Sequence, residues 1–366
     1  MAWKKLARVI IMTHIIILLN ILTIFKKTVL TFFRFFWGKP LPEVVRTPEL
    51  RFQLAEIERL GYKFKPNYVH LKIGGEVTLP RVHYLNEGPQ NAKDVMLCLH
   101  GEPSWSFLYR KMIPILANNG YQVIVPDFIG FGKSDKYSHE VNYTHEMHRM
   151  TLRLLIEHLD LKNITLVCQD WGGLTGLSVV KDMPDRFSRI VVMNTGLPTG
   201  TDFGALLQSA KDYQTKLTVI SRACNFMFWQ SSVRFFGEHY PYKFLFKYLV
   251  GFRDEIATAY AAPFPSAEYK AGPAKWPLLV PVMESDPVAC DMRMNRKFFE
   301  SWRKPCLVMF SDRDPITKGM DKFFIKLIPS SEHVTIHGAG HFLQEDKGEE
   351  IARNIVQFAK RNAAVS

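Results

Sequence analysis

A five-residue turn constrains the fold of this chain more than any other feature of its sequence. The turn reads QDWGG at residues 169–173, and it follows a short apolar run, ITLVC, at residues 164–168. Such a run is typical of a fully buried strand, and the LTGL that follows at 174–177 is typical of a helix start. A strand, a sharp glycine-rich turn and a helix predict a nucleophile elbow, in which one side chain stands exposed at the end of a sheet.

The exposed residue of this elbow is Asp170, at the position where a serine hydrolase carries serine. A carboxylate attacks an electrophilic carbon to form an ester, and a second step must then hydrolyse that ester. This chemistry suits displacement at a saturated carbon better than acyl transfer. The alternative is an ordinary surface turn that happens to contain an aspartate, and the residues downstream argue against it.

The residues that would assist this nucleophile follow in the order acid, then histidine, as the elbow requires. His341 lies in the glycine-rich loop HGAGHF at 337–342, before the last predicted helix. Two aspartates follow the strand predicted at 306–310. We expect Asp314 to be the acid, because it lies further beyond the strand end and the proline after it fixes the turn; Asp312 is the alternative.

A strand predicted at residues 95–99 runs into the sequence HGEPSWS at 100–106. A strand that ends in His-Gly at this place predicts an oxyanion hole, here formed by the backbone N–H groups of Glu102 and Trp171. The side chain of Glu102 is either structural or takes a direct part in the site.

Four segments together closely resemble the haloalkane dehalogenases of the α/β-hydrolase fold, over roughly residues 50–362. They are HGEPSWSFLYR at 100–110, QDWGG at 169–173, AYAAPFP at 259–265 and GAGHF at 338–342. The resemblance implies Asp170 as nucleophile, His341 as base and Asp314 as acid, with no cofactor. In another subgroup of that family the acid follows an earlier strand, where this chain has Asn194.

The resemblance also implies how a halide ion leaves. Family members hold the departing ion with two N–H donors, one on the residue after the nucleophile and one in the cap. Trp171 fills the first position, and Trp229, thirty residues before Ala259, fits the second. Tryptophan is a donor-only side chain that suits a soft anion in an apolar pocket. The alternative role for Trp229 is packing among the phenylalanines around it.

Strand candidates alternate with helical patterns along the chain, which predicts a mostly parallel sheet. The candidates are 95–99, 122–126, 164–168, 189–193, 306–310 and 333–337. Residues 196–290 interrupt this alternation and are rich in Phe, Tyr and Met, so we expect a helical cap there. The predicted organisation is a membrane anchor and linker at 1–46, a first core segment at 47–195, the cap, and a second core segment at 291–366.

The N-terminus predicts a membrane anchor. Residues 9–25 form a 17-residue apolar stretch with basic flanks, and an aromatic segment follows at 32–37. The first is just long enough to span a bilayer, and the second suits its interface. His14 and Asn20 are costly in lipid, so a single-pass and a monotopic anchor both remain open. A cleaved signal peptide is the other alternative, although no small-residue cleavage site follows the stretch.

The basic charge of the chain is concentrated in this segment, because residues 1–46 carry a net charge of +7 out of the formal +12. The remaining +5 on the body does not suggest a nucleic-acid-binding protein. The five cysteines show no CxxC motif and no zinc-site spacing with histidine. They indicate reduced core residues and no metal site.

These features predict a membrane-anchored enzyme that hydrolyses the carbon–halogen bond of a small apolar substrate with water and releases halide. An epoxide hydrolase is the main alternative, since it uses the same Asp–His–acid set with, usually, two cap tyrosines. The cap offers Tyr213, Tyr240, Tyr242, Tyr248 and Tyr260 for this role. A non-catalytic binding protein of this fold is a third hypothesis, but such proteins usually lose triad residues, and this chain keeps all three.

Overall fold

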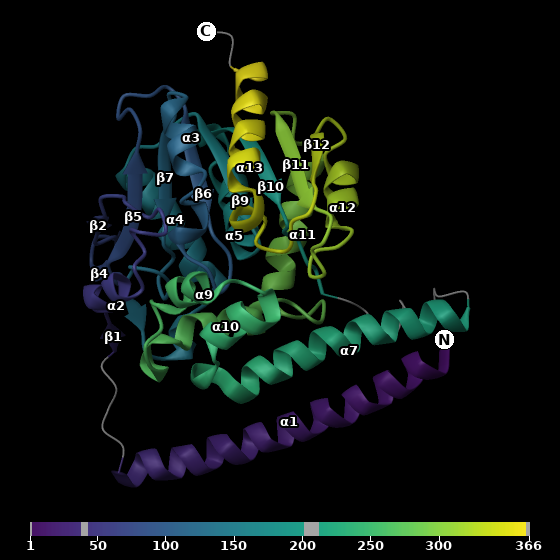
Figure 1. The fold of residues 1–366 in the computed structure, drawn as a ribbon. Helices are drawn as coiled ribbons and strands as arrows, with labels where there is room; N and C mark the ends of the chain where they lie inside the picture. The colour runs from purple at the N-terminus through teal and green to yellow at the C-terminus, as the bar shows by residue number, and fades with distance from the viewer. Residues whose placement is uncertain (1, 38–42, 201–211, 364–366) are drawn as a thin grey trace.

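The computed structural model describes residues 2–37, 43–200 and 212–363. Its centre is an eight-stranded sheet in the order β12-β11-β10-β9-β6-β7-β5-β2, as far as these residues show. Pairs from β7 through to β12 are parallel, and the pairs β2–β5 and β5–β7 are antiparallel. The predicted α/β-hydrolase fold with a mostly parallel sheet is therefore confirmed (Figure 1).

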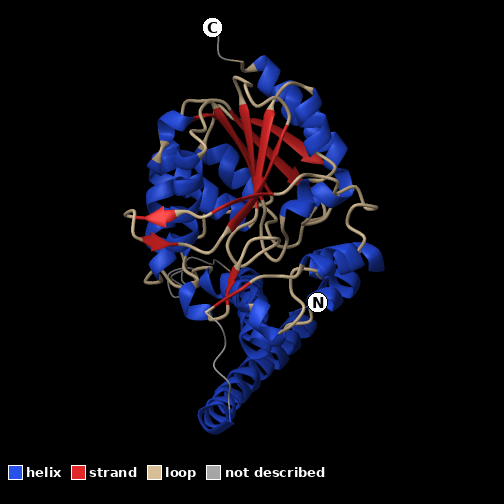
Figure 2. Cartoon of the chain, turned by 90° about the vertical axis from the view of Figure 1, so that its left-hand side faces the viewer, coloured by secondary structure: helices blue, strands red, loops and turns tan. Residues whose placement is uncertain are grey.

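The strands have the following bounds: β1 Val44–Val45, β2 Asn67–Val69, β3 Lys72–Ile73, β4 Val77–Thr78, β5 Val82–Glu87, β6 Val95–Leu99, β7 Gln122–Pro126, β8 Lys136–Tyr137, β9 Ile164–Gln169, β10 Phe187–Met193, β11 Cys306–Ser311 and β12 Glu332–Ile336. The central strands β6 and β9 are buried at every residue, since helices cover both faces of the sheet (Figure 2). This is why their sequences are continuous apolar runs with little alternation.

The helices have the following bounds: α1 Ala2–Trp37, α2 Glu49–Leu54, α3 Ile113–Asn118, α4 His145–His158, α5 Trp171–Asp182, α7 Tyr213–Phe236, α8 Tyr242–Phe244, α9 Asp254–Ala261, α10 Ala271–Leu279, α11 Pro287–Glu300, α12 Met320–Leu327 and α13 Leu343–Arg361. Helix α4 begins where sequence rules place a helix start, because the Thr144 hydroxyl accepts a hydrogen bond from the Met147 N–H. Helices α4 and α11 pack on α5, and α3 packs on α13.

Helices α7 to α10 lie between β10 and β11 in the chain and cover the carboxyl ends of the parallel strands (Figure 1). The rings of His100, Phe128 and Trp171, which follow β6, β7 and β9, all contact Trp276 of α10. Helix α11 packs against α5 of the core, so it crosses the expected cap boundary at residue 290.

The N-terminal helix α1 lies alongside α7, beyond the cap (Figure 1). Its segment Lys5–Lys26, with a mean hydropathy of 2.2, is long and apolar enough to cross a membrane by length and composition, a test that an N-terminal signal sequence also passes. The body begins earlier than the expected linker end at residue 46, because β1 pairs with β8 and Arg46 forms an ion pair with Asp135.

Candidate active site

The turn at Asp170 has the strained geometry that the sequence predicts. Asp170 adopts φ 52° and ψ −126°, a conformation that L-residues rarely adopt, between the end of β9 and the start of α5. A Cβ on Gly172 would collide with the backbone of Leu99 and His100, so only glycine permits this close approach of α5 to β6. The Thr195 hydroxyl donates to the Asp170 carbonyl oxygen at 2.7 Å and holds the turn.

The structure brings Asp170, His341 and Asp314 together, although they come from three distant parts of the chain. His341 Nε2 lies 3.5 Å from Asp170 Oδ2, and His341 Nδ1 lies 3.0 Å from Asp314 Oδ2. Asp314 is itself buried and accepts further hydrogen bonds from the Ile316 N–H and from Thr317. The acid therefore has a fixed orientation toward the imidazole.

The electrostatics of the three residues are strongly coupled. Burial alone would lower the pKa of His341, but its hydrogen bonds and charge interactions with Asp170 and Asp314 raise that pKa to about 10. Burial would raise the pKa of Asp314, but the hydrogen bond from His341 and the interactions with Thr317 hold that pKa below its ordinary value. The hydrogen bonds to Asp170 and Asp314 therefore favour the protonated form of His341.

The competing aspartate, Asp312, lies elsewhere. Its Oδ1 accepts from the Gly338 N–H at 2.9 Å, and its Oδ2 lies 3.2 Å from Nδ1 of the exposed His337. These contacts tie β11 to the glycine-rich loop at the surface, so Asp312 shapes the loop without reaching His341.

Asn194, which the sequence marks only as a missing acid, has a positioning role that sequence analysis did not detect. Its Nδ2 donates to the carbonyl oxygens of Gly340 and His341, each at 3.1 Å. Its Oδ1 accepts from the Ser311 N–H at 3.0 Å. Gln169 also donates to the His341 carbonyl oxygen, at 3.2 Å. The histidine loop is thus fastened to β9, β10 and β11 at once.

The Glu102 N–H, one of the two donors expected for an oxyanion hole, contacts the elbow. The Glu102 N–H donates to Asp170 Oδ1 at 2.8 Å. Trp171 is the first residue of α5, where backbone N–H groups lack acceptors within the helix. Burial, followed by the nearby charge of Asp170, raises the pKa of the Glu102 side chain well above its ordinary value.

The two expected tryptophans are not side by side. Trp171 stacks on Trp276, with ring centroids 5.4 Å apart and an interplanar angle of 19°. Trp229 is 36% exposed and contacts the ring of Phe226, and no ring contact joins it to Trp171 among the described residues. The helix explains this: Gln230 of α7 donates to the carbonyl oxygens of Pro277 in α10 and of Val280 just after it, so its neighbour Trp229 points about 100° away from that contact.

Trp276 is a feature that sequence analysis missed. It is fully buried, and its indole Nε1 has no hydrogen-bond partner within the described part of the chain. Buried N–H donors are nearly always paired, so this one is available to an acceptor next to Trp171.

Within residues 2–37, 43–200 and 212–363, no three His, Cys, Asp or Glu side chains are grouped so that they could hold a metal ion.

Comparison with known proteins identifies the family. The chain matches the alpha/beta hydrolase fold over residues 94–218. It is 41% identical to a haloalkane dehalogenase of Psychrobacter cryohalolentis over 87% of this chain and 99% of that protein. A haloalkane dehalogenase of Mycobacterium marinum is 36% identical over 86% of this chain and 99% of that protein. This chain belongs to the haloalkane dehalogenase family.

The solved structures agree with this membership. The tetrameric haloalkane dehalogenase DpaA from Paraglaciecola agarilytica NO2 is 35% identical, with a TM-score of 0.72 over 86% of this chain and 97% of that one. Membership of the dehalogenase family also argues against the epoxide-hydrolase alternative.

Two of the segments that resemble the dehalogenase family, 100–110 and 259–265, meet at one buried carboxylate, Glu345, three residues after a third segment. The Arg110 guanidinium donates to both carboxylate oxygens of Glu345 at 2.6 Å, and the Tyr260 hydroxyl donates to the same carboxylate at 2.9 Å. Glu345 follows the histidine loop directly, so this pair fastens the catalytic loop to the start of α3 and to cap helix α9. Although burial opposes it, the contact with Arg110 holds the pKa of Glu345 below its ordinary value.

We expect Glu345→Gln to lower the free energy of unfolding by about 3–5 kcal/mol, because it leaves the buried Arg110 charge unpaired. Urea unfolding at pH 7 measures this loss. Glu332→Gln is the matched control, because its pair with Arg361 is exposed and should be worth under about 1 kcal/mol. Since the pKa of Glu345 is lowered on folding, its contribution is present at neutral pH and disappears as the pH falls through that pKa. Equal losses in the two variants would contradict the role of the network.

Proposed function

We propose that this protein hydrolyses haloalkanes to an alcohol, a halide ion and a proton through an ester on Asp170. The observation that carries the proposal is the carboxylate at the elbow, 3.5 Å from His341 and held by the Glu102 N–H. A hydroxyl nucleophile would suit acyl transfer, whereas a carboxylate suits displacement at a saturated carbon. Family membership supports the same reaction.

In the first step, Asp170 Oδ2 attacks the alkyl carbon and the halide leaves with the electron pair of the carbon–halogen bond. Oδ1 is already bound by the Glu102 N–H, so it becomes the carbonyl oxygen of the ester. The indole N–H of Trp171 stabilises the negative charge that develops on the halogen. Stabilisation of this kind lowers the barrier because the charge is larger in the transition state than in the bound substrate.

In the second step, His341 activates water against the ester. Alkylation removes the charge of Asp170, one of the two carboxylates that raise the pKa of His341, so the imidazolium now releases its proton to solvent. Neutral His341 takes a proton from water as the oxygen attacks the ester carbonyl carbon. The Glu102 and Trp171 N–H groups hold the resulting oxyanion. When this intermediate collapses, the alkoxide leaves with the proton of the newly added hydroxyl, so the alcohol is released, the Asp170 carboxylate is restored and His341 is again an imidazolium.

A second halide donor has two candidates. Trp229 is the one that the sequence suggests, and Trp276 is supported by its stacking on Trp171 and its unpaired indole N–H. We expect bromide to quench the intrinsic fluorescence saturably. Trp171→Phe and Trp276→Phe should weaken that quenching and slow halide release about a hundredfold each, because a lost donor to a developing charge is worth about 3 kcal/mol.

Trp229→Phe is the matched control for this experiment, since Trp229 lies on α7 without a ring contact to Trp171 among the described residues. It should keep both quenching and turnover. The reverse result, in which Trp276→Phe keeps normal quenching and turnover and Trp229→Phe loses them, would assign the second donor role to Trp229.

We propose further that α1 attaches the enzyme to a membrane. Its apolar length, its exposed aliphatic side chains and its basic flanks support this assignment. A small apolar haloalkane partitions into lipid, so the location suits the substrate class.

A further inference from the structure

The N-terminal helix makes polar contacts with the cap along most of its apolar length. Among the described residues, hydrogen bonds join four side chains of α1 to α7, and both helices advance in the same direction from one contact to the next. The contacts are Lys5 Nζ to Thr218 Oγ1 (3.1 Å), Thr13 Oγ1 to Cys224 Sγ (3.9 Å), Asn20 Nδ2 to Ser231 Oγ (3.1 Å) and Lys26 Nζ to the Phe235 carbonyl oxygen (2.9 Å). Helices α1 and α7 are therefore a parallel pair, side by side in Figure 1.

The pairing uses one face of α1 throughout. Thr13 and Asn20 are seven residues apart, and so are their partners Cys224 and Ser231. A seven-residue repeat keeps the same face of one helix against another, as in a coiled coil. The buried residues Val9, Ile16 and Thr23 of α1 follow the same spacing.

The opposite face of α1 is apolar and uncovered. Ile11, Leu18 and Phe25, again seven residues apart and two residues on from Val9, Ile16 and Thr23, are 59%, 54% and 67% exposed. They belong to a larger exposed set that also includes Ile10, Ile15, Ile17, Ile21, Leu22 and Ile24. A contiguous apolar surface of this length marks an interaction site. The segment carries no acidic residue and has basic residues at both ends, which suits a bilayer with anionic headgroups better than a protein surface.

The direction of α1 relative to the body follows from α7. The Gln230 side chain of α7 donates to the carbonyl oxygens of Pro277 and Val280, at 3.0 and 3.2 Å, which fixes α7 to α10 within the cap. A helix that crossed a bilayer would have to leave the body after a few turns. Helix α1 instead stays on α7 from Lys5 to Lys26, so it lies along the surface of the enzyme.

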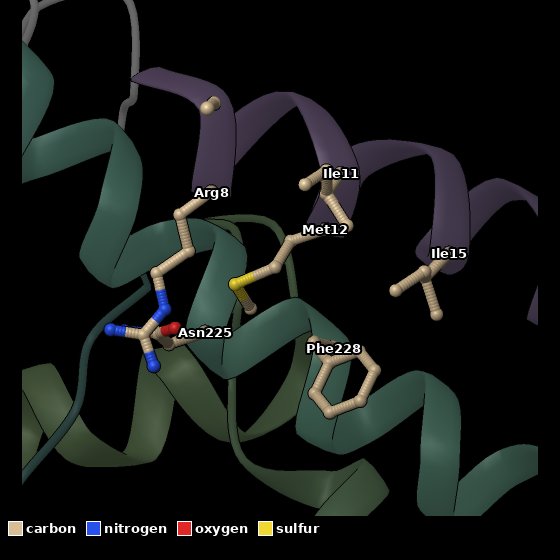
Figure 3. Close-up of a pocket in the computed structure, with 7 residues that line it drawn as sticks. Arg8, Ile11, Met12, Ile15, Asn225 and Phe228 are labelled. Carbon is tan, nitrogen blue, oxygen red and sulfur yellow. The ribbon is translucent and has the colours of Figure 1, made fainter. Parts of the chain in front are cut away.

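We propose that α1 lies in the plane of the membrane interface, paired with α7, and that the enzyme rests on the bilayer through its cap. This inference rests on the membrane attachment proposed above and adds the orientation. The carboxyl ends of the strands, where Asp170 lies, then face the membrane, so an apolar substrate reaches the cap from the lipid. A groove of about 570 Å³ between the helices, lined by Ile11, Met12, Ile15 and Phe228 with Arg8 at its edge, has room for a lipid chain whose headgroup meets the guanidinium (Figure 3).

A disulfide test follows from the contact between Thr13 and Cys224. In a Cys290→Ser background of the full-length enzyme, Thr13→Cys places a second thiol beside the native one, because the Thr13 hydroxyl lies 3.9 Å from Cys224 Sγ. The protein is bound to phosphatidylcholine–phosphatidylserine vesicles and oxidised with copper phenanthroline. Non-reducing digestion and mass spectrometry should show residues 13 and 224 joined in most of the vesicle-bound protein.

Leu18→Cys in the same background is the control, because Leu18 is 54% exposed on the side of α1 away from α7 and should give only background crosslinking. Asn20→Cys with Ser231→Cys provides a second cysteine pair between α1 and α7 if the first variant folds poorly. Vesicle-bound protein with no crosslink at either cysteine pair would overturn the in-plane pairing of α1 with α7 and leave membrane attachment standing. Protein that does not bind the vesicles would overturn the attachment, and the orientation with it.

Discussion

Asp170→Asn should reduce haloalkane turnover by about 10⁴-fold or more, and His341→Phe should stop the reaction at the alkylated enzyme. The amide has no anionic oxygen to displace a halide. Without His341, displacement still proceeds, because Asp170 keeps its place at the elbow and its hydrogen bond from the Glu102 N–H. Intact mass spectrometry of His341→Phe mixed with substrate should therefore show the protein mass increased by the alkyl group.

The double variant Asp170→Asn/His341→Phe is the control for this adduct and should keep its unmodified mass. Peptide mapping should place the added alkyl group on Asp170. An unmodified His341→Phe protein, under conditions in which the wild type turns over, would contradict a covalent mechanism.

Asp314→Asn should lower turnover by about 10³- to 10⁴-fold, and Asp312→Asn should leave it within about twofold. Asp314 Oδ2 fixes the imidazole from 3.0 Å and supplies charge that raises the pKa of His341, whereas Asp312 contacts only the exposed side of the loop. Steady-state halide release compares the two variants. Each replaces one carboxylate oxygen with an amide nitrogen, and the two positions are only two residues apart.

Rapid-quench measurement separates a positioning role from a loss of folding. In Asp314→Asn the first halide should still appear in a burst equal to the enzyme concentration, because Asp314 acts on ester hydrolysis. A variant that had lost its fold would show no burst. A normal Asp314→Asn enzyme beside an inactive Asp312→Asn enzyme would move the acid role to Asp312.

The sheet and the elbow were predictable because their signals are local. The runs at 95–99, 122–126, 164–168, 189–193, 306–310 and 333–337 all fall on strands, with ends within a few residues. Both faces of these strands are buried, so the apolar run is continuous and its ends are marked by turn residues. The antiparallel strands β2 and β5 gave weaker signals, because one is short and the other mixes buried and half-buried positions.

The contacts that were not predictable depend on packing between distant helices. Trp276 lies next to Trp171 because α10 packs over the strand ends. The spacing of residues along the chain could not show whether Trp276 or Trp229 would take this place. The role of Asn194 depends on β10 lying between β9 and β11, where its amide meets the histidine loop. The pairing of α1 with α7 joins residues more than 200 positions apart, which a hydropathy pattern cannot anticipate.

The fate of the water oxygen tests the covalent account most directly. In a single turnover in H₂¹⁸O, with enzyme in excess over haloalkane, the bond between the alkyl carbon and the Asp170 oxygen stays intact while water attacks the ester carbonyl carbon. The account therefore predicts an alcohol that carries ordinary oxygen and an Asp170 carboxylate that carries the label. An alcohol fully labelled in its first turnover, with unlabelled Asp170, would mean that water attacks the substrate directly, and would contradict the central role of the Asp170 ester.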